Sequence, residues 1–284
     1  MKKIHKKILI IIAIAYGIVI LVFLLLPEDN IIVPKGNADE HYVQGIIHYQ
    51  KGQYDQAISE HNKTTKIEPR DIQAYRYRGL AYVEKGELDE AILNFTQAIE
   101  KDPRSYLDYI HRGNTYRAKQ EYELALRDYT KAIEINSKSV DAYMGLARTY
   151  KAKGELDLAT KNQKKAIELE AEKRYSSAEF SYERIKKYGD KPVVSESDYH
   201  YENGKWIYKS TGNRHESDLA ISDYTMAIEL NSKYSKAYVN IADIYYMKKN
   251  YDKAWENIHK AESLGHQVPP EFLDKLRKAS GRQR

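Results

Sequence analysis

A period of 34 residues runs through this chain and constrains its fold more than any single residue does. Small residues recur at this spacing in two sets, which are Gly45, Gly79, Gly113 and Ala147, and Ala57, Ala91, Ala125 and Ala159. Such self-similarity is typical of stacked repeats, in which each unit buries its apolar face only against its neighbours. We therefore expect an extended binding surface rather than an active-site pocket.

Each unit predicts two amphipathic helices joined by a tight turn. In residues 72–105, Tyr75, Gly79 and Tyr82 share one helical stripe, and Gly86 then breaks the helix. A second apolar stripe follows and ends at an Asp-Pro pair. Neither helix can bury its stripe alone, so the unit requires stacking. The recurring tyrosines are expected to fill the core.

The spacing of small residues, large residues and the closing proline resembles the tetratricopeptide repeat. The first unit is atypical, because His61 and Thr64 stand where the other units have an aromatic residue and alanine. The resemblance implies an all-α fold, a right-handed α-solenoid of helix hairpins with a concave peptide-binding groove. The expected units are 38–71, 72–105, 106–139, 140–173, 197–234 and 235–268.

Residues 174–196 interrupt the period and predict an irregular helical insert. Its apolar points are Tyr175, Phe180 and Ile185, without the small-residue spacing of the units. We therefore expect a bend between a block of four repeats and a block of two.

The unit at 197–234 has a longer turn than the others. Its recurring small residues, Gly204 and Ala220, are sixteen positions apart rather than twelve. After the last unit, residues 269–284 predict a short capping helix followed by a basic tail.

The N-terminus predicts a membrane anchor. Residues 1–7 are basic, and residues 8–26 contain no charge and only Tyr16 as a polar group. A helix of nineteen residues is about 28 Å long, close to the thickness of the hydrocarbon core. The positive-inside rule places residues 1–7 in the cytoplasm and the repeats on the other side, after a tether at 27–37.

Two other interpretations of this segment remain open. A cleaved signal peptide would use Ala13-Ile14-Ala15, but that site lies inside the apolar run. A buried soluble helix is disfavoured by the asymmetry of the flanking charges. Because the chain has no cysteine, lipoprotein processing is excluded. The lysine-rich, cysteine-free sequence resembles that of a bacterial single-pass protein of the inner or cell membrane.

The resemblance also assigns candidate binding residues. In this family the concave face comes mainly from the second, fifth, ninth and twelfth residues of each unit. The part near the membrane would be apolar and the part near the interruption basic, which suits a peptide with an apolar anchor and an acidic segment or C-terminal carboxylate. An ordinary solvated face is the competing interpretation. The candidates are Tyr42, Ile46, Tyr49, Leu80, Val83, Ile110, Asn114, Arg117, Arg148, Lys151, Lys205 and Lys209.

No catalytic, metal or cofactor site is expected. The nine histidines are scattered, and His200, His215 and Glu216 are too weak a pattern for a metal site. Outside the N-terminal lysines the net charge is only +1, from 42 basic and 41 acidic residues, which argues against nucleic-acid binding. The positions of the family's carboxylate clamp hold unsuitable residues, so docking of chaperone tails by that route is not expected.

The sequence therefore predicts a non-enzymatic, membrane-anchored scaffold that recruits proteins at an extracytoplasmic surface. A cytosol-facing anchored receptor or co-chaperone is one alternative. The regulatory arm of a membrane enzyme complex is another.

Overall fold

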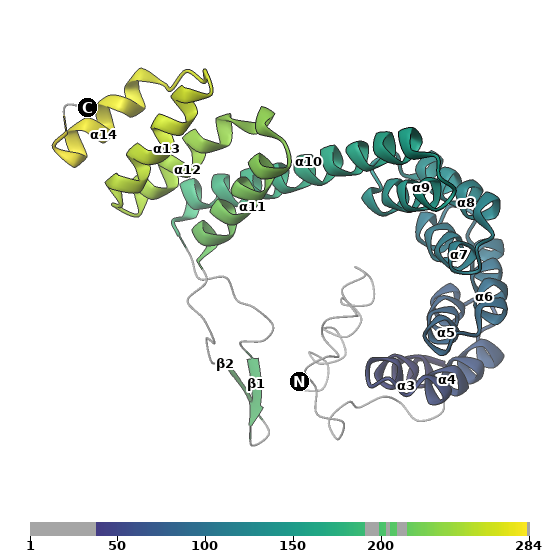
Figure 1. Cartoon of the computed structure of the whole chain (residues 1–284). Coiled ribbons are helices and arrows are strands. Elements are labelled where there is room, and N and C mark those ends of the chain that lie inside the picture. Colours follow the sequence, from purple (N-terminus) through teal and green to yellow (C-terminus); the bar gives the residue numbers. More distant parts are fainter. Residues whose placement is uncertain (1–37, 191–198, 203–204, 209–214, 283–284) are drawn as a thin grey trace. The chain divides into compact units, whose positions relative to one another are not determined.

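The computed structural model describes residues 38–190, 199–202, 205–208 and 215–282 (Figure 1). These residues divide into two compact units. The N-terminal unit contains residues 38–163 and two short strands, and the C-terminal unit contains residues 164–190 and 215–282. The predicted anchor at 8–26 and the tether lie outside the described residues. Among the described helices, none is both long and apolar enough to cross a membrane.

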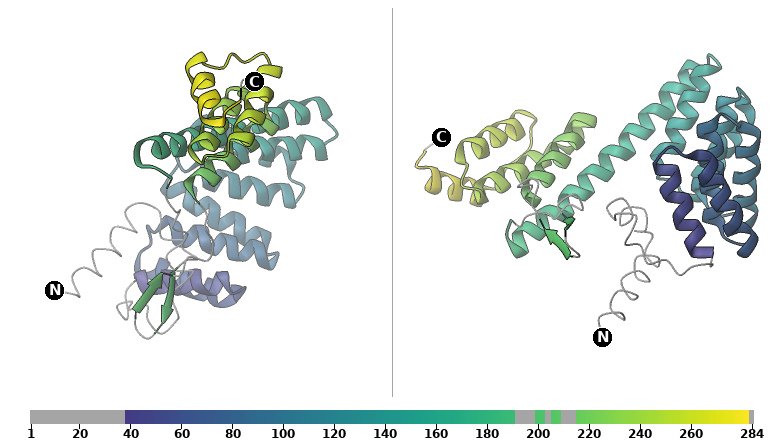
Figure 2. Two further views of the ribbon diagram at one scale, coloured as in Figure 1. Left: turned by 90° about the vertical axis from the view of Figure 1, so that its left-hand side faces the viewer. Right: turned by 90° about the horizontal axis from the view of Figure 1, so that it is seen from below.

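The N-terminal unit is a stack of helix hairpins in chain order (Figure 2). Each helix contacts the next, and the first helices of the hairpins also contact one another. In Figure 1 these first helices lie on the inner side of the curve and the second helices on the outer side. The helices are α3 (Ala38–Gln50), α4 (Tyr54–Ile67), α5 (Ile72–Lys85), α6 (Leu88–Lys101), α7 (Tyr106–Ala118), α8 (Tyr122–Ile135) and α9 (Val140–Ala152).

The recurring glycines allow the two helices of a hairpin to approach closely. A Cβ atom at Gly79 would lie 2.8 Å from the Phe95 ring, and one at Gly113 would lie 3.0 Å from the Tyr129 ring. A Cβ atom at Gly145, in the first helix of the next hairpin, would lie 2.4 Å from the same Tyr129 ring. Both rings are fully buried. The small residues of the 34-residue period are thus packing residues, as the pattern indicates.

The turn inside each hairpin requires a left-handed residue. Gly52, Gly86 and Gly154 have φ between +72° and +82°, which glycine adopts without strain. Gln120 and Lys249 take the same place in two other hairpins with φ of 63° and 57°. These two turns therefore have the same left-handed geometry although they contain no glycine at this position.

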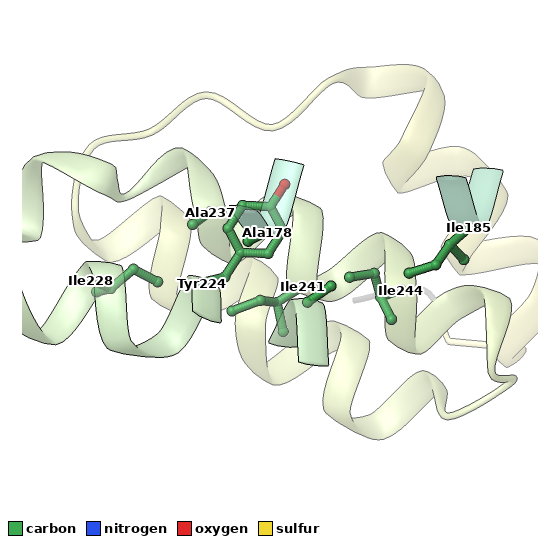
Figure 3. Packing of buried hydrophobic residues seen from close by; sticks show 8 residues of the cluster. Ala178, Ile185, Tyr224, Ile228, Ala237, Ile241 and Ile244 are labelled. Atoms are coloured by element: carbon green, nitrogen blue, oxygen red, sulfur yellow. The ribbon is translucent and has the colours of Figure 1, made fainter. Parts of the chain in front are cut away.

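The C-terminal unit corrects the predicted boundaries of the later repeats. Helix α10 (Leu156–Tyr188) runs without interruption from the second helix of the fourth repeat through most of the expected insert. Its last part packs against α11 (Glu216–Leu230) and α12 (Lys236–Met247), so it is the first helix of the next hairpin (Figure 3). The residues of this core are Ala178, Ile185, Ala220, Tyr224, Ile228, Ala237, Ile241 and Ile244.

The expected helix around Gly204 is absent from the described part of that segment. Instead β1 (Tyr199–Glu202) and β2 (Lys205–Tyr208) form an antiparallel hairpin in which Tyr199 is opposite Tyr208. Tyrosine, tryptophan and isoleucine favour strands, which is consistent with this local structure. The long interval before α11 is therefore an insertion within a helix hairpin, and the described fold is all-α apart from these strands.

The last hairpin is covered by a terminal helix. After the short 3₁₀ helix Ser232–Tyr234 and α12, helix α13 (Tyr251–Ser263) packs against α14 (Pro270–Ser280). Leu276 is fully buried, and Trp255 Nε1 donates to Ser280 Oγ at 3.1 Å. Helix α14 therefore shields the apolar face of the final repeat.

Candidate peptide-binding surface

The inner face of the N-terminal unit carries most of the candidate residues. We use this name for the accessible side chains of α3, α5, α7 and α9, the helices on the inner side of the curve in Figure 1. Eight candidates are partly or fully exposed there, namely Tyr42, Tyr49, Leu80, Val83, Asn114, Arg117, Arg148 and Lys151.

Four other candidates do not contribute as expected. Ile46 and Ile110 are only 2% and 5% exposed, because packing between neighbouring helices covers them. They cannot contact a ligand without rearrangement. Lys205 lies on β2 rather than on a helix, so its expected helical position is wrong. Lys209 lies outside the described residues.

One end of the inner face is aromatic. The ring centroids of Tyr42 and Tyr49 lie 6.0 Å and 6.3 Å from that of Tyr77, and both pairs are edge-to-face. Such contacts hold rings in fixed orientations. Burial raises the pKa of Tyr42 and of Tyr49, with neighbouring tyrosines and carboxylates adding to the effect. Both hydroxyls therefore stay neutral at physiological pH.

Half-buried aliphatic side chains continue this aromatic end on α5. Leu80 and Val83 are partly exposed and one helical turn apart. Together with Tyr42 and Tyr49 they form a surface that can bury an apolar side chain of a ligand.

The other end of the inner face is basic. Arg148 and Lys151 are exposed on α9, and Arg117 is half-buried on the adjacent α7. None of these three cations forms an ion pair with any residue in the described part of the chain. Arg117 Nε is itself buried, so the exposed cationic groups at this end are those of Arg148 and Lys151. The basic end therefore has cationic donors available for an anionic ligand.

Tyr129, a fully buried residue of α8, lies next to the basic end. Its hydroxyl donates to Asn114 Oδ1 at 2.7 Å, which orients the exposed amide. Burial raises the pKa of Tyr129, while Arg117 and Arg148 act in the opposite direction. The amide of Asn114 and the cations Arg117 and Arg148 thus lie near one buried ring.

An ion pair between two first helices, α5 and α7, was not anticipated from the sequence. Arg76 binds Asp108 through two hydrogen bonds of 2.6 Å and 2.7 Å, and Asp108 is 0% exposed. The two residues are 32 positions apart, close to the repeat period, so opposite charges at that spacing could have suggested the contact. Because Asp108 neutralises Arg76, this arginine adds no unpaired positive charge between the aromatic end and the basic end.

Comparisons with known proteins agree with the repeat architecture. Residues 45–86 and 113–154 match the family described as TPR repeat, and residues 72–105 and 140–173 match tetratricopeptide repeat. A search of curated proteins gives no match.

Solved structures give a similar but weaker likeness. The crystal structure of MamA is 20% identical, with 78% of this chain and 94% of that chain covered and a TM-score of 0.39. The first TPR of Spaghetti (RPAP3) bound to the HSP90 peptide SRMEEVD is 23% identical, with 44% and 99% covered and a TM-score of 0.41. The Cut9 and Hcn1 hetero-tetramer is 16% identical, with 86% and 42% covered and a TM-score of 0.44.

The hairpin stack, its glycine–aromatic contacts and the sequence matches lead to one conclusion. Residues 45–105 and 113–173 of this chain are tetratricopeptide repeats, of the class that mediates protein–protein interaction.

Proposed function

We propose that this protein is a membrane-anchored scaffold whose inner face binds an extended segment of a partner protein. The aromatic end would hold an apolar side chain, and the basic end would hold an acidic segment or a C-terminal carboxylate. The observation that carries the proposal is the group of three cations without ion-pair partners, Arg117, Arg148 and Lys151, beside the amide of Asn114. Charge-assisted hydrogen bonds to carboxylates are about twice as strong as neutral ones.

Charge reversal at the basic end tests this proposal. The probe is a fluorescent peptide with two leucines followed by three glutamates and a free C-terminus, and binding to the full chain in mild detergent is measured by anisotropy. We expect Arg148→Glu combined with Lys151→Glu to weaken binding about tenfold or more, since one charged contact contributes about 1.5–3 kcal/mol.

A matched control changes the net charge equally on other helices. Arg127 on α8 and Lys161 on α10 are exposed, so their double reversal to glutamate should leave the affinity within about twofold. Equal loss in both double variants would show that only the net charge matters. Unchanged binding after reversal of Arg148 and Lys151 would remove the proposed ligand class.

The membrane anchor and the extracytoplasmic location form a separate part of the proposal. They are supported by the uncharged run at 8–26 and the four lysines before it. Mass spectrometry of the mature protein should give an intact N-terminus, whereas a start near residue 16 or 27 would contradict the anchor. Protease treatment of intact cells should digest the repeats; protection would favour a cytosol-facing receptor.

A further inference from the structure

In α5, α7, α9 and α12, one face of the helix stacks on the preceding hairpin. In α5 this face contains Ala74 and Ala81, seven residues apart and both 0% exposed, and α5 contacts the preceding α4. In α12 the same two places are held by Ala237 and Ile244, also 0% exposed. The corresponding residues of α7 and α9 are at most 2% exposed, namely Asp108, Thr115, Ala142 and Thr149.

The register of α10 identifies its own stacking face. In the hairpin α5–α6, Arg78 Nε donates to Asn94 Oδ1 at 2.6 Å, and the next residue, Gly79, contacts Phe95.

In the later hairpin, Ser177 Oγ donates to Asp223 Oδ2 at 2.8 Å, and the next residue, Ala178, lies in one core with Tyr224 (Figure 3). In α5 the stacking residues lie four positions before and three positions after Arg78. The same offsets from Ser177 give Lys173 and Phe180 as the stacking face of α10.

This stacking face is uncovered in the C-terminal unit. Phe180 is 66% exposed, in contrast to the buried residues at the same place in α5, α7, α9 and α12. The cause is the continuity of α10. In the other repeats a turn folds the preceding second helix back onto this face, whereas α10 continues without a turn. Within the C-terminal unit, no described helix precedes it.

Three cations lie in line with Phe180 along α10, and the neighbouring Glu183 pairs with Lys186 outside this line. Lys173, Phe180, Arg184 and Lys187 are spaced by seven, four and three residues, so they form one stripe along the helix. The Arg184 guanidinium lies 5.7 Å from the Phe180 ring centroid, and its Nε lies 3.0 Å from Glu216. Neither lysine forms an ion pair with a described residue.

We propose that this stripe of α10 binds an acidic amphipathic helix of a partner protein, in the place that a preceding second helix occupies in the other repeats. An exposed aromatic side chain supplies the apolar contact, and the flanking cations select for acidic residues. The chain itself contains a helix of this kind. Residues 87–101, which include α6, carry four acidic residues and one basic residue and stack on α7.

The test uses that segment as its probe. A fluorescent, helix-stabilised peptide of residues 87–101 is titrated with the full chain in mild detergent, since an unstabilised peptide of this length is barely helical. We expect saturable binding that weakens at least about tenfold with Phe180→Asp and with Lys173→Glu combined with Lys187→Glu. Replacing the peptide's acidic residues by glutamine should weaken binding similarly.

Two control variants change comparable surface features elsewhere in the same unit. Leu264 is 51% exposed, and Lys275 and Lys278 are exposed on α14. Leu264→Asp and the double reversal Lys275→Glu with Lys278→Glu should bind within about twofold of the unchanged chain. Because Phe180 is exposed, the Phe180→Asp variant should fold and give the same far-ultraviolet circular dichroism spectrum as the unchanged chain.

Three results would overturn this proposal. The first is no saturable binding of the acidic peptide, or equal binding by Phe180→Asp. The second is a dimer that Phe180→Asp dissociates in sedimentation, which would make a second copy the occupant. The third is binding to phosphatidylserine vesicles that depends on Phe180 while the peptide does not compete, which would assign the stripe to a lipid surface.

Discussion

His61 is expected to make the first repeat sensitive to acid, and His61→Phe should remove that sensitivity. The imidazole is 0% exposed, and neither Nδ1 nor Nε2 has a hydrogen-bond partner. Its ring stacks on Tyr77 at 5.9 Å, and a Cβ atom at Gly45 would lie 2.5 Å from it. Phe95 occupies the same position in the next repeat, so an apolar ring suits this site.

The size of the effect follows from the pKa. Burial, followed by the nearby Arg78 charge, lowers the pKa of His61 to about 4, while Glu60 acts weakly in the opposite direction. Tyr42 and Tyr77, from α3 and α5, also face the ring.

The unfolded state has a pKa of about 6.5, so between about pH 6.5 and 4 it binds a proton that the folded state does not bind. Stability therefore falls as the pH decreases through this range. The loss is about 2 kcal/mol between pH 7.5 and 5 and about 3 kcal/mol at the acidic limit.

Hydrogen exchange reports the stability of the first repeat itself, since individual repeats can open locally. The exchange of α4 amides is compared between the variant and the unchanged chain at each pH, so that intrinsic rates cancel. At pH 7.5 the variant should be about 1–2 kcal/mol more stable, because it buries no unpaired nitrogen. The ratio of the protection factor of the variant to that of the unchanged chain should be about thirtyfold higher at pH 5 than at pH 7.5. A ratio that does not change with pH would refute the assignment of acid sensitivity to His61.

Three further changes test the packing of the repeats, with stability measured by urea unfolding. Arg76→Ala should cost about 3–5 kcal/mol, because it leaves Asp108 charged and fully buried; a loss below about 1 kcal/mol would contradict this. Gly145→Ala should cost about 1–3 kcal/mol, since its methyl group would overlap the Tyr129 ring, and an unchanged midpoint would show that the ring can move. Gln120→Gly should stabilise the protein by up to about 1 kcal/mol by relieving a φ of 63°, and any loss would argue that side-chain contacts of Gln120 outweigh the strain.

The repeated hairpins could be predicted because small residues keep a fixed distance from the rings that they contact. Gly79 and Phe95, for example, are sixteen residues apart and remain so from repeat to repeat. The hairpin of α10 and α11 breaks this rule, since Ala178 and Tyr224 share a core across an insertion. The insertion leaves this core contact in place but changes the residue spacing, so the spacing pattern does not identify the hairpin.

The candidate site was predictable only in part. The exposed cations Arg148 and Lys151 follow from the repeat positions, because no neighbour is required to place them. Ile46 and Ile110 were assigned by the same rule but are buried, since one step of about 100° around a helix separates the inner face from the core. Whether such a border residue is covered depends on the neighbouring helix, which the pattern within one unit does not describe.

The insertion between α10 and α11 is closed at its base. Asp190 accepts hydrogen bonds from the backbone and hydroxyl of Ser217, at 3.0 Å and 2.7 Å, and Lys248 donates to the same hydroxyl at 2.8 Å. The two ends of the inserted segment are thus joined by side chains of the repeat itself. The cost of closing a loop grows only slowly with its length. This position can accept segments of different length or sequence while the repeat keeps its packing, which makes it a natural place to graft a reporter or an affinity tag.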